Sequence, residues 1–237
     1  RDVVPDSERH GTERLRHHRA PSAVRPARPH PRIRGRASTV TDRDAQGRVK
    51  GLQVPIETTS IDGLLVVRWD THGDERGFFR QTYRTDELAE ALGREVVFRQ
   101  GNHSRSAPGV LRGFHAEPWD KLVYVTRGTA MAAIADIRPD SPTFGEVATF
   151  HLGDPPGERI RLYVADGLAN AYCTYGDEPV DYLYDVSAEY RSVDKRAIAW
   201  DDPDLAVDWP VAAPVVSEAD RRNPTLRQRF PDHPMFR

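Results

Sequence analysis

The stretch KLVYVTRGTAMAAIADI, residues 121–137, is the strongest indication of the fold class. It contains two apolar runs rich in β-branched and small residues, and the Arg127-Gly128 step between them has the composition of a tight hairpin turn. Further strand-like runs, separated by Pro and Gly turn signals, recur every 8–14 residues or so, at 64–70, 96–100, 146–152, 159–165, 171–175 and 180–186. This spacing predicts an all-β protein, either an antiparallel sandwich or a barrel.

Helices are expected to be few and short. The segment TDELAEALG, 85–93, has a helical pattern in which Thr85 is a suitable N-cap and the closing glycine suits the C-terminal end. The stretch from Asp201 onward is rich in proline and tryptophan. It predicts an extended C-terminal wrap with one short helix around 217–222.

The N-terminal region differs in composition from the rest. Residues 1–50 contain 13 Lys and Arg against 6 Asp and Glu, whereas the whole chain of 237 residues has a formal net charge of −2. So few apolar residues occur there that burial cannot offset the loss of chain entropy. We therefore predict a disordered Arg/Pro-rich extension at 1–48 and one domain at 49–237. The extension lacks Phe, Tyr and Trp for base stacking, which argues against a nucleic-acid arm.

Several protein classes are disfavoured by what the sequence lacks. The single cysteine, Cys173, excludes an intramolecular disulfide and fits a reducing, cytoplasmic setting. The sequence contains no run of 18 apolar residues, so we expect no membrane-spanning helix. Phosphate-loop, dinucleotide, CxxC, HExxH and GxSxG motifs do not occur. The functions that these absences leave open are acid–base catalysis, metal chemistry and simple ligand binding.

The densest group of polar residues lies in GNHSRSAPGVLRGFHAEPWDKLV, 101–123. In a regular strand, His115 shares a face with Leu111 and Gly113, and Arg112 faces the other way. A bulge at Gly113 would turn Arg112 toward the face of His115. From the residues alone, a core histidine with a surface arginine and a shared polar site both remain open.

Six blocks together resemble the dTDP-4-dehydrorhamnose 3,5-epimerase family, in order and with similar spacing. They are DERGFF (74–79), Gln100-x-Asn102-x-Ser104, GVLRGFH (109–115), DKLV (120–123), ADIRPDSPTFG (135–145) and WDDPDLAVDWP (200–210). The resemblance implies a cupin-type double-sheet jelly roll that usually forms a homodimer by exchanging an edge strand. It also implies an isomerase that uses no metal or organic cofactor, with a nucleoside-diphosphate 4-keto-6-deoxy sugar as substrate.

The resemblance also assigns roles to individual residues. It implies that His115 is the catalytic base, Asp220 its carboxylate partner and Tyr184 the proton donor on the opposite face of the sugar. It places Lys121 and Arg112 as cations near the ketone and the diphosphate. The other implied substrate-binding residues are Arg76, Gln100, Asn102, Asn170 and Tyr190.

The chemistry independently requires such groups. A proton next to a ketone is weakly acidic, so a base that titrates near neutral pH and a cation that stabilises the enolate are both needed. Inversion needs a second proton-handling group across the ring. A sugar-nucleotide ketoisomerase and a non-catalytic or metal-binding cupin are the alternatives.

The chain departs from the family pattern at several positions. Asn170 stands where a second histidine is usual, Gln81 where many members have glutamate, and Glu189 where an aromatic residue is common. The link between His115 and Lys121 is short, and its Glu117 and Trp119 are unusual. Whether C3, C5 or both are inverted, and which nucleotide is bound, therefore stay open.

Overall fold

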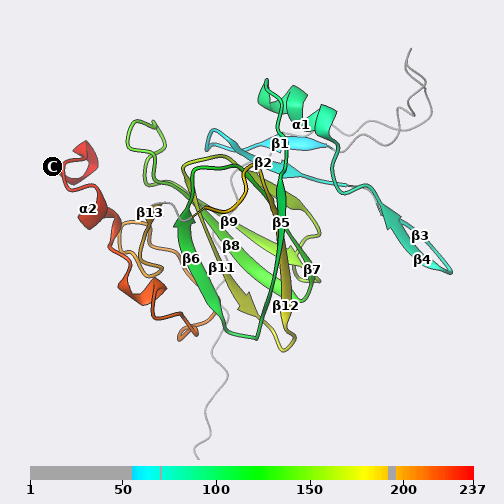
Figure 1. The fold of residues 1–237 in the computed structure, drawn as a ribbon. Helices are drawn as coiled ribbons and strands as arrows, with labels where there is room; N and C mark the ends of the chain where they lie inside the picture. The colour runs from blue at the N-terminus through cyan, green and yellow to red at the C-terminus, as the bar shows by residue number, and fades with distance from the viewer. Residues whose placement is uncertain (1–54, 70, 192–195) are drawn as a thin grey trace, which may run out of the picture. The chain divides into compact units, whose positions relative to one another are not determined.

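The computed structural model describes residues 55–69, 71–191 and 196–237. The predicted extension at 1–48 lies outside the described residues. The described strands form two antiparallel sheets and a separate hairpin (Figure 1). The expected all-β jelly roll with short helices is confirmed.

One sheet has six strands and the other has five. The six-stranded sheet has the order β1 (Ile56–Thr58), β2 (Leu64–Val67), β10 (Arg161–Val164), β7 (Lys121–Arg127), β12 (Val180–Val186) and β5 (Gln100–Ser106). The five-stranded sheet has the order β13 (Arg196–Ala197), β6 (Leu111–Ala116), β11 (Leu168–Tyr175), β8 (Thr129–Asp136) and β9 (Val147–Gly153). Side chains from the facing sides of both sheets form the main apolar core, which includes Val123, Leu162, Ile134 and Tyr172.

The hairpin predicted at Arg127-Gly128 is wrong. β7 ends at Arg127 in the six-stranded sheet, and β8 begins at Thr129 in the five-stranded sheet, so the chain crosses between sheets at this point. Gly128 has a φ of 74°, and a Cβ there would lie 2.6 Å from the carbonyl oxygen of Pro179. A glycine is needed at this corner, as in a hairpin turn, and the local sequence therefore looks the same in both cases.

The strand predicted at 96–100 is also displaced. Val96 and Phe98 pack in the cluster that covers Leu88 of α1 (Thr85–Leu92), and the strand β5 begins only at Gln100. The helix is confirmed, but its N-cap is Arg84 and not Thr85. No helix in the described part of the chain is long and apolar enough to cross a membrane.

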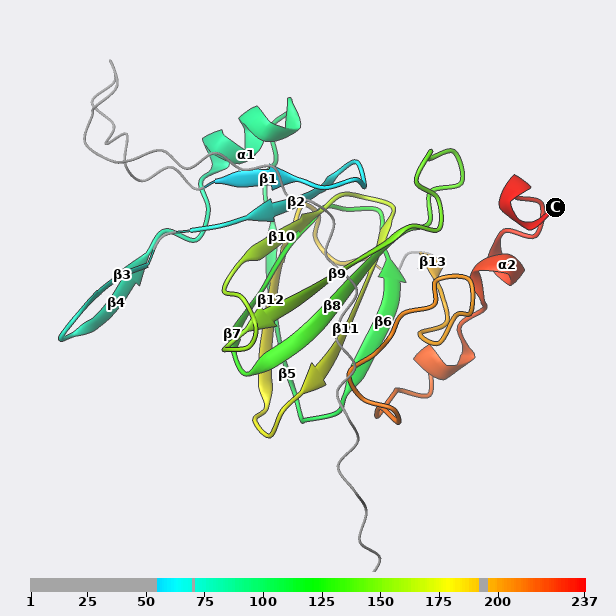
Figure 2. The same ribbon diagram turned by 180° about the vertical axis from the view of Figure 1, so that it is seen from behind.

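The C-terminal segment follows the outer side of the five-stranded sheet (Figure 2). It contains the 3-10 helices η1 (Asp220–Arg222) and η2 (Pro234–Phe236) and the short helix α2 (Leu226–Arg229). Leu226 and Trp209 pack with Phe114 and Ala171 on that side. This packing places η1 next to β6.

The hairpin of β3 (Thr71–Asp74) and β4 (Gly77–Arg80) extends away from both sheets (Figures 1 and 2). Within the described residues these two strands pair only with each other. Phe78 and Phe79 are 60% and 67% exposed on it. An exposed pair of large apolar side chains is typical of a surface that another chain covers.

A bulge in β6 places two of the predicted site residues on one face. Arg112 pairs with Tyr172 of β11, whereas His115 pairs with Asn170, so three steps along β6 match two steps along β11. Both partners point into the space between the sheets, and Arg112 and His115 therefore do so as well. Gly113, within the bulge, has a φ of 125°.

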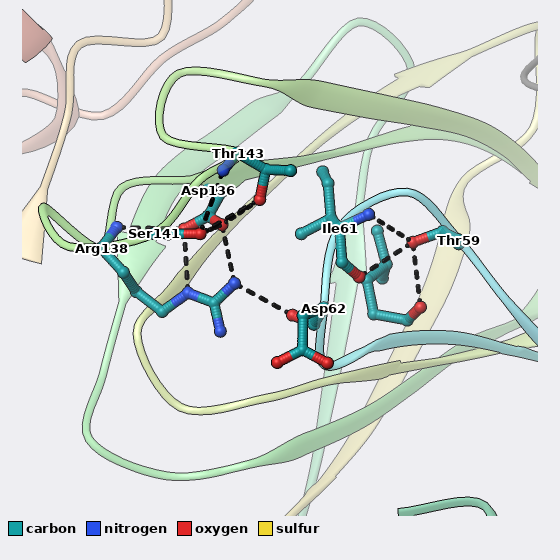
Figure 3. A network of polar contacts seen from close by, with 8 residues as sticks. Thr59, Ile61, Asp62, Asp136, Arg138, Ser141 and Thr143 are labelled. Atoms are coloured by element: carbon teal, nitrogen blue, oxygen red, sulfur yellow. Dashed lines mark hydrogen bonds and ion pairs between the residues drawn. The ribbon is translucent and has the colours of Figure 1, made fainter.

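The block ADIRPDSPTFG, 135–145, closes one end of β8 (Figure 3). Asp136 is fully buried and accepts hydrogen bonds from Arg138 at 2.7 Å and from the hydroxyls of Ser141 and Thr143 at 2.6 Å. Arg138 also donates to the carbonyl of Asp62 at 3.0 Å. Burial alone would raise the pKa of Asp136, but these hydrogen bonds hold it at about 2.

Gly113→Ala is expected to destabilise the protein strongly. A Cβ at this position would lie 2.4 Å from the Cβ of Ala171 and 2.8 Å from the carbonyl oxygen of Asn170. The unfavourable φ and the overpacking together cost roughly 2–5 kcal/mol. Urea unfolding followed by tryptophan fluorescence measures this loss. Gly176→Ala is the matched control, because it has a φ of 84° but nothing within 4 Å. A loss no larger than that of the control would contradict the tight bulge.

Asp136→Asn is expected to lower the free energy of unfolding by roughly 2–4 kcal/mol at neutral pH, because it leaves Arg138 without its buried counter-ion. The folded-state pKa is depressed, so this stabilisation is full above the unfolded value of about 4 and is lost as pH falls toward about 2. Denaturant titrations at several pH values test both statements. The exposed Asp140→Asn in the same loop should leave stability unchanged.

Candidate active site

The centre of the site is a histidine–carboxylate pair. Nε2 of His115 lies 2.6 Å from Oδ1 of Asp220, the first residue of η1. Burial alone would raise the pKa of Asp220, but hydrogen bonds from His115, the Gly113 backbone and Ser217 lower it below its usual value. The ionised carboxylate only accepts hydrogen bonds, so Nε2 carries a proton. In the neutral ring, Nδ1 is then the nitrogen that takes up a proton.

A buried ion pair lies next to this histidine. Lys121, the first residue of β7, is 5% exposed, and its Nζ donates to the carbonyl oxygen of His115 at 3.2 Å. The same Nζ contacts the carboxylate of Glu117, whose side chain is 11% exposed. The short link between β6 and β7 thus brings a cation and its counter-ion together beside the backbone carbonyl of His115.

Tyr184 points from β12 into the space between the two sheets. It pairs in register with Val123, and its ring packs against the main core. Burial raises the pKa of the Tyr184 phenol, and the nearby Glu117 carboxylate raises it further, against the opposing charge of Arg112. The phenol therefore holds its proton at neutral pH and is able to donate it.

A chain of polar contacts continues across the inner faces of the sheets. Nε of Arg112 donates to the hydroxyl of Ser106 at 3.1 Å, and this hydroxyl lies 3.1 Å from the Tyr172 hydroxyl. The rings of Tyr172 and Tyr182 stack at 4.0 Å between centroids. Asn170 and the Tyr182 hydroxyl lie 3.3 Å apart. Asn170 thus faces the site but is already engaged by a phenol.

The start of β5 supplies further polar groups. Nε2 of Gln100 donates to Oδ1 of Asn102 at 2.7 Å, and Oε1 of Gln100 accepts from the backbone N–H of Tyr190 at 2.8 Å. Tyr190 is 58% exposed, and its ring lies 6.3 Å from that of Trp119. A cavity of about 440 Å³ lies here, lined by Arg99, Pro118, Trp119, Ala188, Glu189 and Arg191.

Arg76 is not brought to these residues. It lies at the turn of the β3–β4 hairpin, where it is exposed and pairs with Asp74. The structure therefore gathers nine of the ten predicted site residues around the inner sheet faces and the adjoining end of β12, and leaves Arg76 apart within one chain.

Sequence reasoning singled out Glu117 only as unusual for the family and as a possible start of a metal site, whereas the structure pairs it with Lys121. It also missed Ser106 and Tyr172. Period-two spacing links Tyr172 to Asn170 and Ser106 to Asn102, and this was the available signal. Among residues 55–69, 71–191 and 196–237, no three His, Cys, Asp or Glu side chains cluster as a metal site would require.

The comparisons with known proteins concern the family and the fold. The family model described as dTDP-4-dehydrorhamnose 3,5-epimerase matches residues 58–228. The dTDP-4-dehydrorhamnose 3,5-epimerase of Shigella flexneri is 35% identical over 182 residues, which cover 75% of this chain and 97% of that protein. The dTDP-4-dehydrorhamnose 3-epimerase of Streptomyces niveus is 33% identical over 165 residues, 68% of this chain and 78% of that protein.

A solved structure shows the same fold. It is a 4-keto-6-deoxy sugar epimerase from the novobiocin biosynthetic gene cluster of Streptomyces spheroides, with a TM-score of 0.70 and 30% identity. The match covers 75% of this chain and 89% of that one. With the family model and the curated relatives, this shows that the chain belongs to the dTDP-4-dehydrorhamnose 3,5-epimerase family of isomerases.

Proposed function

We propose that this protein inverts C3, C5 or both in a nucleoside-diphosphate 4-keto-6-deoxy sugar. The observation that carries the proposal is the His115–Asp220 pair, because the buried Lys121 ammonium donates to the backbone carbonyl of the same histidine and Tyr184 lies on the inner face of the sheet that carries Lys121. The names of the relatives supply the substrate class, and the geometry supplies the groups that such a reaction needs.

His115 acts as the base in this mechanism. Nδ1 removes the proton from the carbon next to the C4 ketone, and the electron pair moves to the ketone oxygen as the enolate forms. Asp220 stabilises the resulting imidazolium. The Lys121 ammonium stabilises the developing oxyanion, and loss of one such donor typically costs ~10²–10³ in rate. Arg112, bound to Ser106, provides a guanidinium for the diphosphate.

Tyr184 acts as the acid. Its phenol donates a proton to the same carbon from the opposite face of the ring, so the configuration inverts. The phenolate then regains a proton from solvent, and the His115 imidazolium releases one to solvent. A raised pKa suits this role, because the donor must be protonated before each turnover. Gln100, Asn102 and Tyr190 are proposed to contact the substrate at the β5 end.

Asn170 bears on which carbon is inverted. Its amide lies opposite His115 in the β6–β11 register but cannot supply a proton as a histidinium would. The relative from Streptomyces niveus is a 3-epimerase, whereas the one from Shigella flexneri is a 3,5-epimerase. The position of solvent-derived hydrogen in the product distinguishes these outcomes for this chain.

We further propose a homodimer in which the β3–β4 hairpin reaches the partner subunit. The hairpin exposes Phe78 and Phe79 and carries Arg76, which the resemblance assigns to the nucleotide. The outermost strands of the six-stranded sheet, β1 and β5, each pair on only one side within the described chain. An exchanged hairpin would cover the apolar pair and bring Arg76 to a second site.

The reducing cytoplasm is the proposed location. The single thiol, Cys173, is buried in β11, and burial raises its pKa to about 11. Such a thiol is unreactive and stays reduced there.

The double variant Phe78→Ser/Phe79→Ser is expected to shift the protein from dimer to monomer, because it removes the apolar contact that the partner would cover. Light scattering coupled to size-exclusion chromatography measures the mass. Met235→Ser is the control, since Met235 is 49% exposed at the other end of the chain and should leave the mass unchanged. A wild-type protein that runs as a monomer would reject the dimer.

Incubation in D₂O with a dTDP-4-keto-6-deoxy sugar is expected to introduce deuterium at C3, C5 or both, read by NMR. His115→Ala should reduce this exchange by ~10²–10⁴-fold, because it removes the base. Tyr184→Phe should retain exchange at the carbon that His115 deprotonates but lose inversion, because His115 returns deuterium from the same face.

Two outcomes would contradict the proposed reaction. No exchange in the wild-type protein at either carbon would reject it. A product with a moved carbonyl would indicate a ketoisomerase instead.

A further inference from the structure

A buried arginine that the proposed mechanism does not use contacts the exit of the β3–β4 hairpin. Arg161, the first residue of β10, has a side chain that is only 5% exposed. Its neighbour Leu162 faces the core between the sheets, so Arg161 lies on the outer side of the six-stranded sheet. There Nη1 donates to Oδ2 of Asp185 at 3.1 Å, and Nη2 donates to the hydroxyl of Thr82 at 3.1 Å. Thr82 lies in the link from β4 to α1.

Two tyrosine rings lie against the same guanidinium. Its central carbon, Cζ, is 3.7 Å from the centre of the Tyr124 ring of β7 and 5.0 Å from that of Tyr83, the residue after Thr82. A guanidinium is planar, so its faces can stack on aromatic rings while the N–H groups at its edge donate hydrogen bonds. Arg161 thus joins β7 and β12 to the two adjacent residues through which the chain leaves the hairpin.

The entry to the hairpin is held close to its exit. Arg161 pairs in register with Val67, the last residue of β2. The next residue, Arg68, forms ion pairs with Glu57 of β1 and with Glu158. Within the described residues, β3 and β4 pair with no other strand. The contacts at the root of the hairpin therefore limit the direction in which it leaves the sheet.

We propose that Arg161 is a positioning residue for the exchanged hairpin. It holds the exit so that the hairpin carries Phe78 and Phe79 into the dimer contact and Arg76 to a second site. This inference rests on the proposed function and dimer for its consequences. The hold on the exit is a property of the folded chain and is measurable without turnover, so it is tested separately.

The first test is backbone hydrogen exchange, read by mass spectrometry, in Arg161→Met. Methionine keeps an unbranched side chain against the Tyr124 ring but cannot donate to Asp185 or Thr82. Exchange in peptides that cover 71–83 should become roughly tenfold faster or more, because the exit opens locally more often. Peptides from β8, in the other sheet, should keep their wild-type rate. An unchanged rate in the hairpin of the folded variant would overturn the proposal.

The second test follows the consequences for the dimer and its site. The dissociation constant of the dimer, measured by sedimentation, should rise roughly tenfold or more in Arg161→Met. At protein concentrations that keep the dimer assembled, the KM for a dTDP-4-keto-6-deoxy sugar should rise while kcat stays near the wild-type value. The reason is that Arg76 is proposed to contact the nucleotide and not the reacting carbon.

A purely structural role for Arg161 predicts a different result. It would lower the free energy of unfolding and leave the dissociation constant and KM unchanged, which would overturn the proposal. A wild-type protein that is a monomer would also overturn it, because no partner would receive the hairpin. If the wild-type dimer introduces no deuterium into the sugar, the proposed function fails, yet hairpin exchange and the dissociation constant still decide whether Arg161 positions the hairpin.

Arg105→Met is the matched control. Arg105 also pairs with an aspartate of β12, Asp181, at 2.7 Å, but lies on β5, away from the hairpin root. This variant should change neither hairpin exchange nor the dissociation constant. Should Arg161→Met fail to fold, Thr82→Val removes one of the hydrogen bonds at nearly constant volume, and hairpin exchange should rise by a smaller factor. An unchanged rate in Thr82→Val would then overturn the proposal.

Discussion

The bulge in β6 is the constraint on which the site depends. Strict alternation would send Arg112 and His115 to opposite sides of the five-stranded sheet, and the extra residue in β6 turns both inward. The close approach of Ala171 leaves no room for a side chain at Gly113. The relative orientation of the proposed base and of the proposed substrate-binding cation is therefore set by a residue that takes no part in the proposed chemistry.

Pairing governs how charge is buried in this site. An isolated charge between two apolar sheets costs several kcal/mol, so each ionised group needs a partner. Asp220 is paired with His115, and Glu117 is paired with Lys121. In the first case the carboxylate partners the proposed base, and in the second it partners the cation proposed to stabilise the oxyanion. The contacts that make the burial tolerable thus involve the groups that the proposed reaction needs.

Periodicity predicted most of the strands because their core-facing residues are apolar, as in β8, where all eight residues are buried. It failed at β5, whose sequence QGNHSRS contains no large apolar residue. β5 is an edge strand of the six-stranded sheet. Its inner face carries hydrogen-bonding groups in place of apolar ones, namely Gln100, Asn102 and Ser104. The usual strand signal is weak there because the inner face is polar, as a ligand site requires. The crossing at Gly128 was missed for a different reason: turn composition reports a change of direction and not which sheet the next strand joins.

The site residues were predicted from blocks of resemblance, and such blocks mix structural and chemical roles. ADIRPDSPTFG is as distinctive as GVLRGFH, yet its Asp136 is satisfied by Arg138, Ser141 and Thr143, so the network closes on itself and holds the end of β8. His115 is different, because Asp220 engages one ring nitrogen and leaves the proton-accepting role to the other. Contact geometry therefore separates residues with structural roles from residues with chemical roles, which resemblance alone does not do. A buried charge whose contacts are all internal maintains the fold, whereas one that orients a proton acceptor toward the space between the sheets is available for the proposed reaction.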